Sequence, residues 1–187
     1  MNRIHRWLCG SAYWRNFLEQ NVMPWVLDGA ELGEHLLEVG PGPGLTTDLL
    51  RFRTRRGTAI ELDSALATTL ASRLRDADVA VVRGDGTKMP FRDHQFSGAV
   101  CFTMLHHLPS RSLQDELLQE VWRVLRPGAW FVGADSLQSW KMRLIHIGDT
   151  LVPVNPNTLH TRLVSAGFVG VQIETNSRAF RFRACRP

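Results

Sequence analysis

The sequence predicts an α/β protein in which helices cover both faces of a mostly parallel sheet. Apolar runs with strand character alternate along the chain with segments of helical periodicity, which is typical of parallel strands joined by crossover helices. The length of 187 residues suits one domain. Only residues 175–177 join the last two apolar runs, which is too short for a parallel crossover. These two runs should therefore form an antiparallel hairpin at the end of the sheet.

Seven runs are expected to form strands. They are His35–Val39, Gly57–Leu62, Val79–Val82, Ser97–Phe102, Trp130–Asp135, Phe168–Glu174 and Arg178–Cys185. In the last run, arginines alternate with Phe180, Phe182 and Ala184, so one face of that strand should be buried. Cys101 lies in an apolar run and is expected to pack as a small hydrophobic residue.

Five segments are expected to form helices. They are Ser11–Leu27, Leu45–Arg53, Ser64–Arg75, Leu113–Leu125 and Asn157–Ala166. Asp63 and Ser64 can cap the third helix, and Gly167 can end the last one. Pro127 and Gly128 follow the fourth helix and should turn the chain there.

The composition indicates a folded protein with a modest basic excess. Hydrophobic residues make up 44% of the chain and charged residues 21%, and the formal net charge is +4. Much of the excess lies in two groups, Arg51, Arg53, Arg55 and Arg56, and Arg178, Arg181, Arg183 and Arg186. A phosphate-binding patch is one interpretation. We prefer a helix end for the first group and a half-buried strand for the second.

The cysteines and the N-terminal region exclude several classes of protein. Cys9, Cys101 and Cys185 are far apart and the sequence has no CxxC motif or Cys/His cluster, so neither a disulfide framework nor a structural zinc site is expected. No apolar run approaches the ~20 residues of a membrane span, and the N-terminus lacks the apolar stretch of a signal peptide. We expect a cytoplasmic protein with one domain over residues 1–187. Residues 1–33 would form an N-terminal helical cap, and residues 136–156 a segment on the substrate side.

A glycine turn follows the first expected strand. Gly40, Gly42 and Gly44 alternate with prolines before a helix begins, which lets a ligand approach the backbone and the helix N-terminus. The spacing differs from the GxGxxG of dinucleotide-binding folds. Glu38 precedes the turn and would repel a pyrophosphate, but it suits a ligand with an ammonium group. Glu61 ends the second strand, 21 residues after Gly40, where an acid can accept bonds from both ribose hydroxyls.

Further motifs extend this pattern along the chain. They are Gly84–Phe91, Phe96–Val100 leading to Leu105–Leu108, and Leu125–Gly128. With the glycine turn, they make the sequence from Leu36 to Cys185 resemble the class I S-adenosylmethionine-dependent methyltransferases. The resemblance is to the small-molecule branch, similar to the ubiquinone and menaquinone methyltransferases. It implies a Rossmann-like sheet of seven strands, of which the last is antiparallel.

The resemblance also implies a cofactor and the residues that bind it. The cofactor would be S-adenosyl-L-methionine and the product S-adenosyl-L-homocysteine, with in-line transfer of the methyl group to a small-molecule acceptor. The implied cofactor residues are Glu38, Gly40, Gly42, Gly44, Glu61, Leu62, Asp85, Gly86, Phe102 and Thr103. Glu38 would lie near the methionine amino group, Glu61 at the ribose, and Asp85 at the adenine. The alternative for Glu38 is an acid that stabilises the turn, and for Asp85 a plain turn residue. Gly86 stands where this branch often has alanine.

Histidines and aromatic residues are the candidates for the acceptor side. His106 and His107 follow the fourth strand, where one of them can take a proton from the acceptor. The alternative is a structural hydrogen bond for at least one of the two. Tyr13, Trp14, Trp140 and His146 lie in the two segments left over for an apolar or aromatic acceptor. The alternative is that the first segment is an amphipathic helix that covers the sheet.

Other chemistries are disfavoured by the residues at the strand ends. A metal site is not expected, because no carboxylate follows the fourth strand and only Asp135 follows the fifth. Nucleic acid is not expected as a partner, because residues 102–105 do not match the Asp/Asn-Pro-Pro-aromatic turn of enzymes that methylate base amino groups. Two other functions stay open. They are a nicotinamide-dependent oxidoreductase and a catalytically silent cofactor-binding module.

Overall fold

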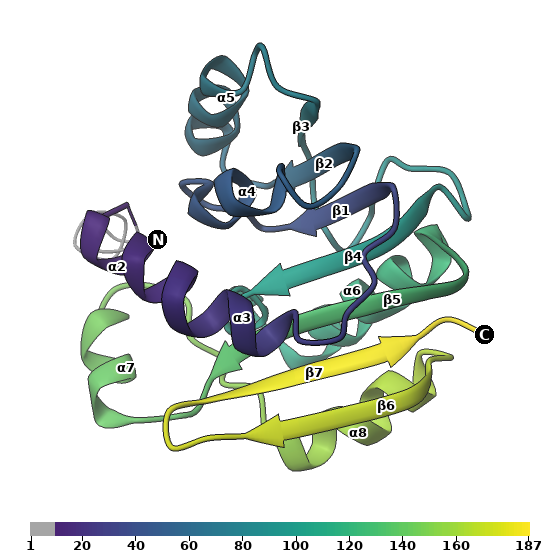
Figure 1. Ribbon diagram of the computed structural model, residues 1–187. Helices are drawn as coiled ribbons and strands as arrows, with labels where there is room; N and C mark the ends of the chain where they lie inside the picture. Colours follow the sequence, from purple (N-terminus) through teal and green to yellow (C-terminus); the bar gives the residue numbers. More distant parts are fainter. Residues whose placement is uncertain (1–9) are drawn as a thin grey trace.

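The computed structural model describes residues 10–187, and the sheet within them has seven strands in the order β3-β2-β1-β4-β5-β7-β6 (Figure 1). The strands are β1 (His35–Val39), β2 (Arg56–Glu61), β3 (Val79–Arg83), β4 (Phe96–Phe102), β5 (Leu125–Ser136), β6 (Val169–Thr175) and β7 (Ala179–Cys185). The first five strands are parallel, and β7 is antiparallel to both β5 and β6. The expected fold class and the C-terminal hairpin are confirmed.

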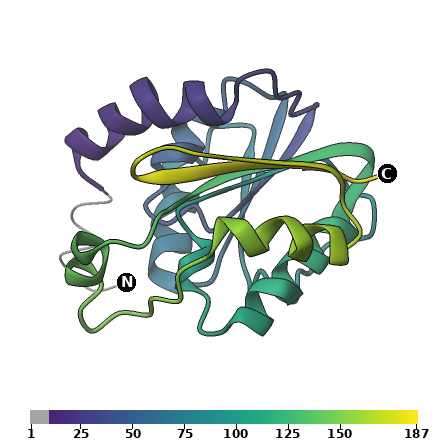
Figure 2. The same cartoon turned by 90° about the horizontal axis from the view of Figure 1, so that it is seen from below.

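Helices lie on both faces of this sheet (Figure 2). One face is covered by α3 (Met23–Val26), α4 (Leu45–Leu50) and α5 (Ser64–Arg73), and the other by α6 (Arg111–Val124) and α8 (Pro156–Ser165). Successive residues of β1 show why two layers form. Leu36 packs with Met23 and Leu50 on one face, whereas Leu37 packs with Leu117 on the other.

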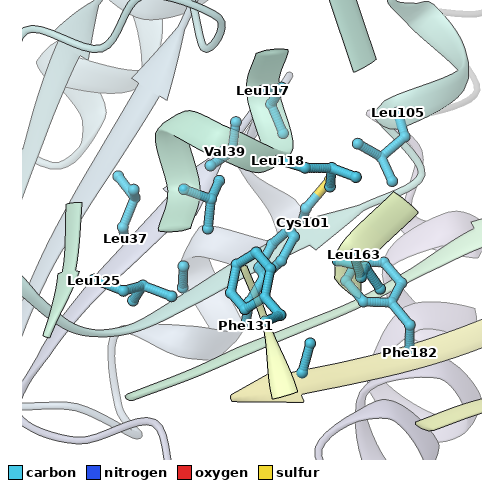
Figure 3. Packing of buried hydrophobic residues seen from close by; sticks show 14 of the residues in the cluster. Leu37, Val39, Cys101, Leu105, Leu117, Leu118, Leu125, Phe131, Leu163 and Phe182 are labelled. Carbon is cyan, nitrogen blue, oxygen red and sulfur yellow. The ribbon is translucent and has the colours of Figure 1, made fainter. Parts of the chain in front are cut away.

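The larger core cluster lies between the sheet and the helices α6 and α8. Figure 3 shows Leu37, Cys101 and Phe131 of three neighbouring strands packed together with leucines of the two helices. Cys101 and Phe131 have no exposed surface. Cys101 therefore packs as a small hydrophobic residue, as the sequence predicted. This packing fixes the parallel strands and therefore the positions of the loops at their carboxyl ends.

The N-terminal helical segment differs from the uninterrupted helix expected over Ser11–Leu27. It consists of α2 (Ala12–Phe17), a π-helical turn (Leu18–Val22) and α3. The backbone N–H of Met23 bonds to the carbonyl of Leu18, five residues earlier. Pro24 follows directly, and proline has no N–H to bond to the preceding turn of an α-helix. The wider turn accommodates this proline within a continuous helical path.

Three further details correct or refine the expected elements. A short helix, α7 (Trp140–Ile145), lies in the segment expected only to face the substrate. Strand β5 begins at Leu125, which pairs with Phe96, and the register then shifts so that Gly98 pairs with Trp130. The other expected elements agree with the structure to within a few residues, including the end of α8 before Gly167.

The basic residues of the last strand are held by neighbouring groups. Phe180, Phe182 and Ala184 are buried, as the alternation predicted. Arg181 pairs with Glu174 at 2.8 Å, and Arg183 donates to Gln172 at 2.7 Å.

No helix within residues 10–187 combines the length and the apolar character needed to cross a membrane. Cys9 and the first part of the expected N-terminal cap lie outside the described residues.

Candidate functional site

A cavity of about 510 Å³ opens at the carboxyl ends of the parallel strands. It lies where the strand order reverses, since β2 follows β1 on one side and β4 lies on the other. Open α/β sheets bind ligands at such switch points, and this volume is in the range of small-molecule sites. Its walls come from the loops after β1, β2, β3 and β4, from α2, and from residues 149–150.

The glycine turn forms one wall of this cavity. Gly40 has a φ of 67°, and a Cβ there would lie 2.2 Å from Cγ of Met104. The turn is held from outside by Arg73, which donates to the carbonyl of Pro43 at 3.0 Å. Gly40, Pro41, Gly42 and Pro43 line the cavity. The turn therefore offers backbone without side chains to a ligand.

Gly44 lies outside the lining of the cavity, whereas the resemblance implied that it is one of the cofactor residues. It is buried and adopts a φ of 83° as the N-cap of α4. A Cβ there would lie 2.3 Å from Cδ1 of Leu70. Its lack of a side chain therefore allows α5 to pack closely against the start of α4.

Glu61 brings a carboxylate to the cavity wall at the end of β2. One oxygen accepts the backbone N–H of Gly42 and the other accepts that of Asp63, both at 2.9 Å. A carboxylate oxygen can accept a second hydrogen bond, so both oxygens retain capacity for a ligand's hydroxyl groups. Glu61 therefore links the glycine turn to the second strand end and presents two acceptors side by side.

Glu38 is placed beneath the glycine turn, outside the lining of the cavity. It is only 4% exposed, and its carboxylate accepts hydrogen bonds from the hydroxyls of Thr46 and Thr47, the latter at 2.6 Å. Burial raises the pKa of Glu38 to about 7, although the two threonine bonds oppose this shift. This geometry agrees with the alternative in which Glu38 stabilises the turn. A contact with the amino group of a ligand would require the Glu38 carboxylate to reach the cavity, and in this structure it does not.

The third and fourth strand ends complete the cofactor side. One oxygen of Asp85 accepts the backbone N–H and the hydroxyl of Thr87, each at 2.8 Å, and this fixes the carboxylate at the cavity edge. Gly86 also lines the cavity, and a Cβ there would lie 3.1 Å from Cδ1 of Leu117. Leu62, Phe102 and Thr103 belong to the lining as well. Thr103 has a φ of 48°, a left-handed conformation that is unfavourable for a β-branched residue.

The two adjacent histidines have different surroundings. His107 lines the cavity, whereas His106 is 3% exposed and does not. The ring Nδ1 of His106 donates to Asp135 at 2.5 Å, and the backbone N–H of His106 donates to the other oxygen of that carboxylate at 3.1 Å. Asp135 is 1% exposed at the end of β5. It therefore anchors the turn that carries both histidines.

The predicted acceptor residues are only partly brought together. Trp14 lines the cavity with Leu18, but Tyr13 and Trp140 are 76% and 71% exposed and lie outside the lining. These two side chains extend from α2 and α7 on the outer surfaces of their helices. His146 is buried, with its ring centroid 5.0 Å from that of His106 and 5.1 Å from that of His107.

Several lining residues were not indicated by any sequence motif. Met104 precedes the turn that carries the two histidines, and residues 149–150 reach the cavity from the segment after α7. The backbone N–H of Val152 donates to the carbonyl of His106 at 2.8 Å, which ties that segment to the histidine turn. Such contacts between distant loops have no periodic signal in a sequence.

The residues present fit an adenosyl cofactor. The glycine turn is a cradle that a Cβ at Gly40 would fill, and Glu61 provides a pair of acceptor oxygens suited to the two hydroxyls of a ribose. Asp85 and Gly86 lie at the next strand end. Among the described residues, the group that could hold a metal ion is a separate one and consists of His106, His107 and His146.

Comparisons with known proteins indicate the family of this chain. Residues 37–133 match the family model described as "Methyltransferase domain". A probable S-adenosylmethionine-dependent methyltransferase from Mycolicibacterium smegmatis is 29% identical over 168 residues, which cover 90% of this chain and 60% of that protein. Ribosomal RNA small subunit methyltransferase A from Streptococcus pneumoniae is 34% identical over 94 residues, which cover 48% of this chain and 32% of that protein. The chain thus spans about a third of the length of the ribosomal RNA relatives.

A solved structure extends the likeness to nearly the whole chain. Phosphoethanolamine N-methyltransferase 2 from Haemonchus contortus, in complex with S-adenosyl-L-methionine, matches with a TM-score of 0.69. The match has 13% identity and covers 95% of this chain and 61% of the other, so it shows a shared fold. With more than half of its residues matched by the family model, this chain belongs to the methyltransferase domain family.

Proposed function

We propose that this protein transfers the methyl group of S-adenosylmethionine to a small, largely apolar acceptor bound at the His107 end of the cavity. The observation that carries the proposal is the cavity itself. One end is built from the glycine turn, Glu61 and Asp85, and the other from His107 and apolar side chains. A cofactor and an acceptor held at these two ends would share one enclosed space.

The residues of the cofactor end have separate tasks in this proposal. Glu61 binds the ribose hydroxyls while keeping its bonds to Gly42 and Asp63. The turn from Gly40 to Pro43 receives the methionine part against bare backbone, and Asp85 faces the adenine. Glu38 acts indirectly, because its bonds to Thr46 and Thr47 hold the start of α4 under the turn.

The reaction itself asks mainly for alignment. The sulfonium of bound S-adenosylmethionine supplies an activated methyl group, so the protein must place the attacking atom in line with it. Correct alignment of two reactants is worth roughly 7–11 kcal/mol of the barrier. Trp14, Leu18, Met104 and Leu108 give the cavity apolar walls beside His107. His107 contacts the acceptor there, whereas His106 supports the turn through Asp135.

The positions of the basic residues favour a small molecule over RNA. Arg51, Arg53 and Arg56 lie after α4 and at the start of β2, which is the amino end of the strands, opposite to the cavity. Arg181 and Arg183 are engaged by side chains of β6. Phosphate recognition would need cations around the cavity mouth. The alignment with the ribosomal RNA methyltransferase covers 94 residues, which are 48% of this chain and 32% of that protein.

The test is methyl transfer from labelled S-adenosylmethionine to two separate acceptor pools. One pool contains the small metabolites that pass through a dialysis membrane from a cell extract, and the other is total RNA from the same cells. We expect label in the small-molecule pool, with mass spectrometry then identifying the product. Label in RNA alone would overturn the choice of acceptor. Transfer to neither pool, from protein shown to bind the cofactor, would favour a catalytically silent module.

A further inference from the structure

Three histidines from two distant segments meet beside the cavity. His106 and His107 belong to the single 3-10 turn after β4 (Leu105–His107), and His146 follows α7 as its C-cap. One ring nitrogen of each lies within 4.8 Å of the corresponding nitrogens of the other two. The ring centroids of His106 and His107 are 4.3 Å apart. His106 and His146 are 3% and 7% exposed.

The hydrogen bonds of two rings define which nitrogen can bind a ligand. A carboxylate only accepts, so His106 Nδ1 carries the hydrogen it donates to Asp135, and in the neutral ring the lone pair is then on Nε2. The same argument applies to His146, whose Nδ1 donates to the carbonyl of Met142 at 2.7 Å. Histidines that bind metals usually show this arrangement, because the bond of the far nitrogen fixes the tautomer and the ring orientation.

The Nε2 atom of His106 adds an independent observation. It is buried and has no hydrogen-bond partner within the part of the chain that the structure describes. Leaving a buried acceptor unsatisfied costs free energy, and here the atom belongs to the group of three imidazoles. A cation among the rings would satisfy it.

We propose that His106, His107 and His146 form a binding site for one divalent transition-metal ion of the zinc type. Neutral imidazoles are preferred ligands of Zn²⁺, Cu²⁺ and Ni²⁺, whereas Mg²⁺ and Ca²⁺ prefer oxygen. Zn–N bonds of about 2.0–2.1 Å place tetrahedral ligands about 3.4 Å apart. Since the nitrogens lie within 4.8 Å of one another, binding requires them to approach by up to about 1.4 Å.

The location gives the ion a position open to the cavity. Three protein ligands leave at least one position of a tetrahedral ion free, as in catalytic zinc sites. Because His107 lines the cavity, we expect that position to open toward it. In the metal-free protein the His107 ring itself contacts the acceptor, and in the loaded protein the ion does. This last step rests on the proposed function, whereas metal binding does not.

Metal binding is tested directly on tag-free, full-length protein freed of metal by a chelator. Calorimetric titration with Zn²⁺ should show one ion per chain. His107→Gln and His146→Gln should each weaken the affinity at least about 100-fold, and Asp135→Asn, which acts through His106, about 10–100-fold. His160→Gln is the matched control, because His160 is exposed on α8, and it should bind like the wild type.

A second measurement distinguishes the loss of the metal site from the failure of a variant to fold. Co²⁺ bound by three imidazoles and water gives strong visible absorption, and these bands should be present in the wild type and in His160→Gln but lost in His146→Gln. Each variant is first shown by circular dichroism to be folded. The absence of Zn²⁺ binding in the wild type, or unchanged binding in both His107→Gln and His146→Gln, would overturn the proposal. Since the titration needs neither cofactor nor acceptor, its failure is separate from that of the proposed function.

Discussion

Two acids near the glycine turn have different environments, and the difference decides their roles. Glu61 lines the cavity and keeps acceptor capacity for a ligand, whereas Glu38 lies beneath the turn with its carboxylate bonded to two threonine hydroxyls. Both residues were selected from sequence by position alone. Which way a carboxylate points depends on the threonines of α4, and strand periodicity carries no information about them.

The buried carboxyl of Glu38 predicts a stability change with pH. Burial raises its pKa from 4.5 to about 7. Below pH 4.5 the group is neutral in both the folded and the unfolded state, so its stabilising contribution is complete. As the pH rises through 7, the unfolded state ionises first, and about 3 kcal/mol of stability is lost.

The variant Glu38→Gln should remove this loss, because an amide does not ionise. The free energy of unfolding of the variant, relative to wild type, should rise between pH 4.5 and 7 in urea titrations. Glu116→Gln, on the exposed face of α6, should show no such trend. A difference between Glu38→Gln and wild type that stays constant over this range would contradict the assignment.

The acceptor side predicts a kinetic role for His107. In chelator-treated protein with an acceptor that loses a proton, His107→Gln should lower kcat by about 10²–10⁴. His160→Gln should keep the wild-type kcat. An unchanged kcat in His107→Gln would exclude a role for that ring in proton transfer.

At the scale of elements, the N-terminal helical segment joins fold and function. Met23 and Val26 of α3 pack in the core, while Trp14 and Leu18, one to three turns earlier, line the cavity. The π-helical turn lies between these two parts. One end of the segment is therefore anchored to the sheet, and the other end forms the roof of the cavity.

This arrangement predicts that cofactor binding protects the roof. Amide hydrogen exchange over residues 12–22 should slow when S-adenosyl-L-homocysteine is added, because a ligand fills the space against Trp14 and Leu18. The β6–β7 hairpin over residues 169–185 lies far along the sheet and should exchange at the same rate with and without ligand. Equal exchange of residues 12–22 in both conditions would show that the segment only covers the sheet.

The elements themselves were largely predictable from the sequence, and the exceptions have physical causes. Strands buried on both faces have continuous apolar runs, and the three-residue link before β7 allowed only a hairpin. The helix α7 was missed because six residues give no periodic signal. The π-helical turn was missed because helical periodicity does not show how the chain accommodates Pro24.

The site was predictable only where it follows from the sheet. Residues after β1, β2 and β4 meet at one edge because the strands are parallel, and Gly40, Glu61 and His107 line one cavity there. The approach of His146 to His106 depends on how residues 136–156 fold back. A contact of that kind is set by tertiary packing, and the sequence-based expectation of no metal site considered only Cys/His motifs and the carboxylates at the strand ends.

At the scale of the whole molecule, the reversal of strand order creates the cavity. In Figure 1 the arrowheads of β1 and β4 point toward α2, and α7 lies at the same end of the sheet. The two core layers hold the strands rigid, and the loops at their ends supply the chemistry. The central claim is that this cavity binds S-adenosylmethionine through the carboxylate of Glu61.

The most direct test is calorimetric titration of S-adenosylmethionine into the wild type and two variants. The wild type should bind one cofactor per chain. Glu61→Ala should bind at least about 100-fold more weakly, since two charge-assisted hydrogen bonds of about 1.5–3 kcal/mol each are lost. Glu116→Ala, with an exposed acid removed from α6, should bind like the wild type. Equal affinity in Glu61→Ala and the wild type, with both proteins folded, would contradict the account.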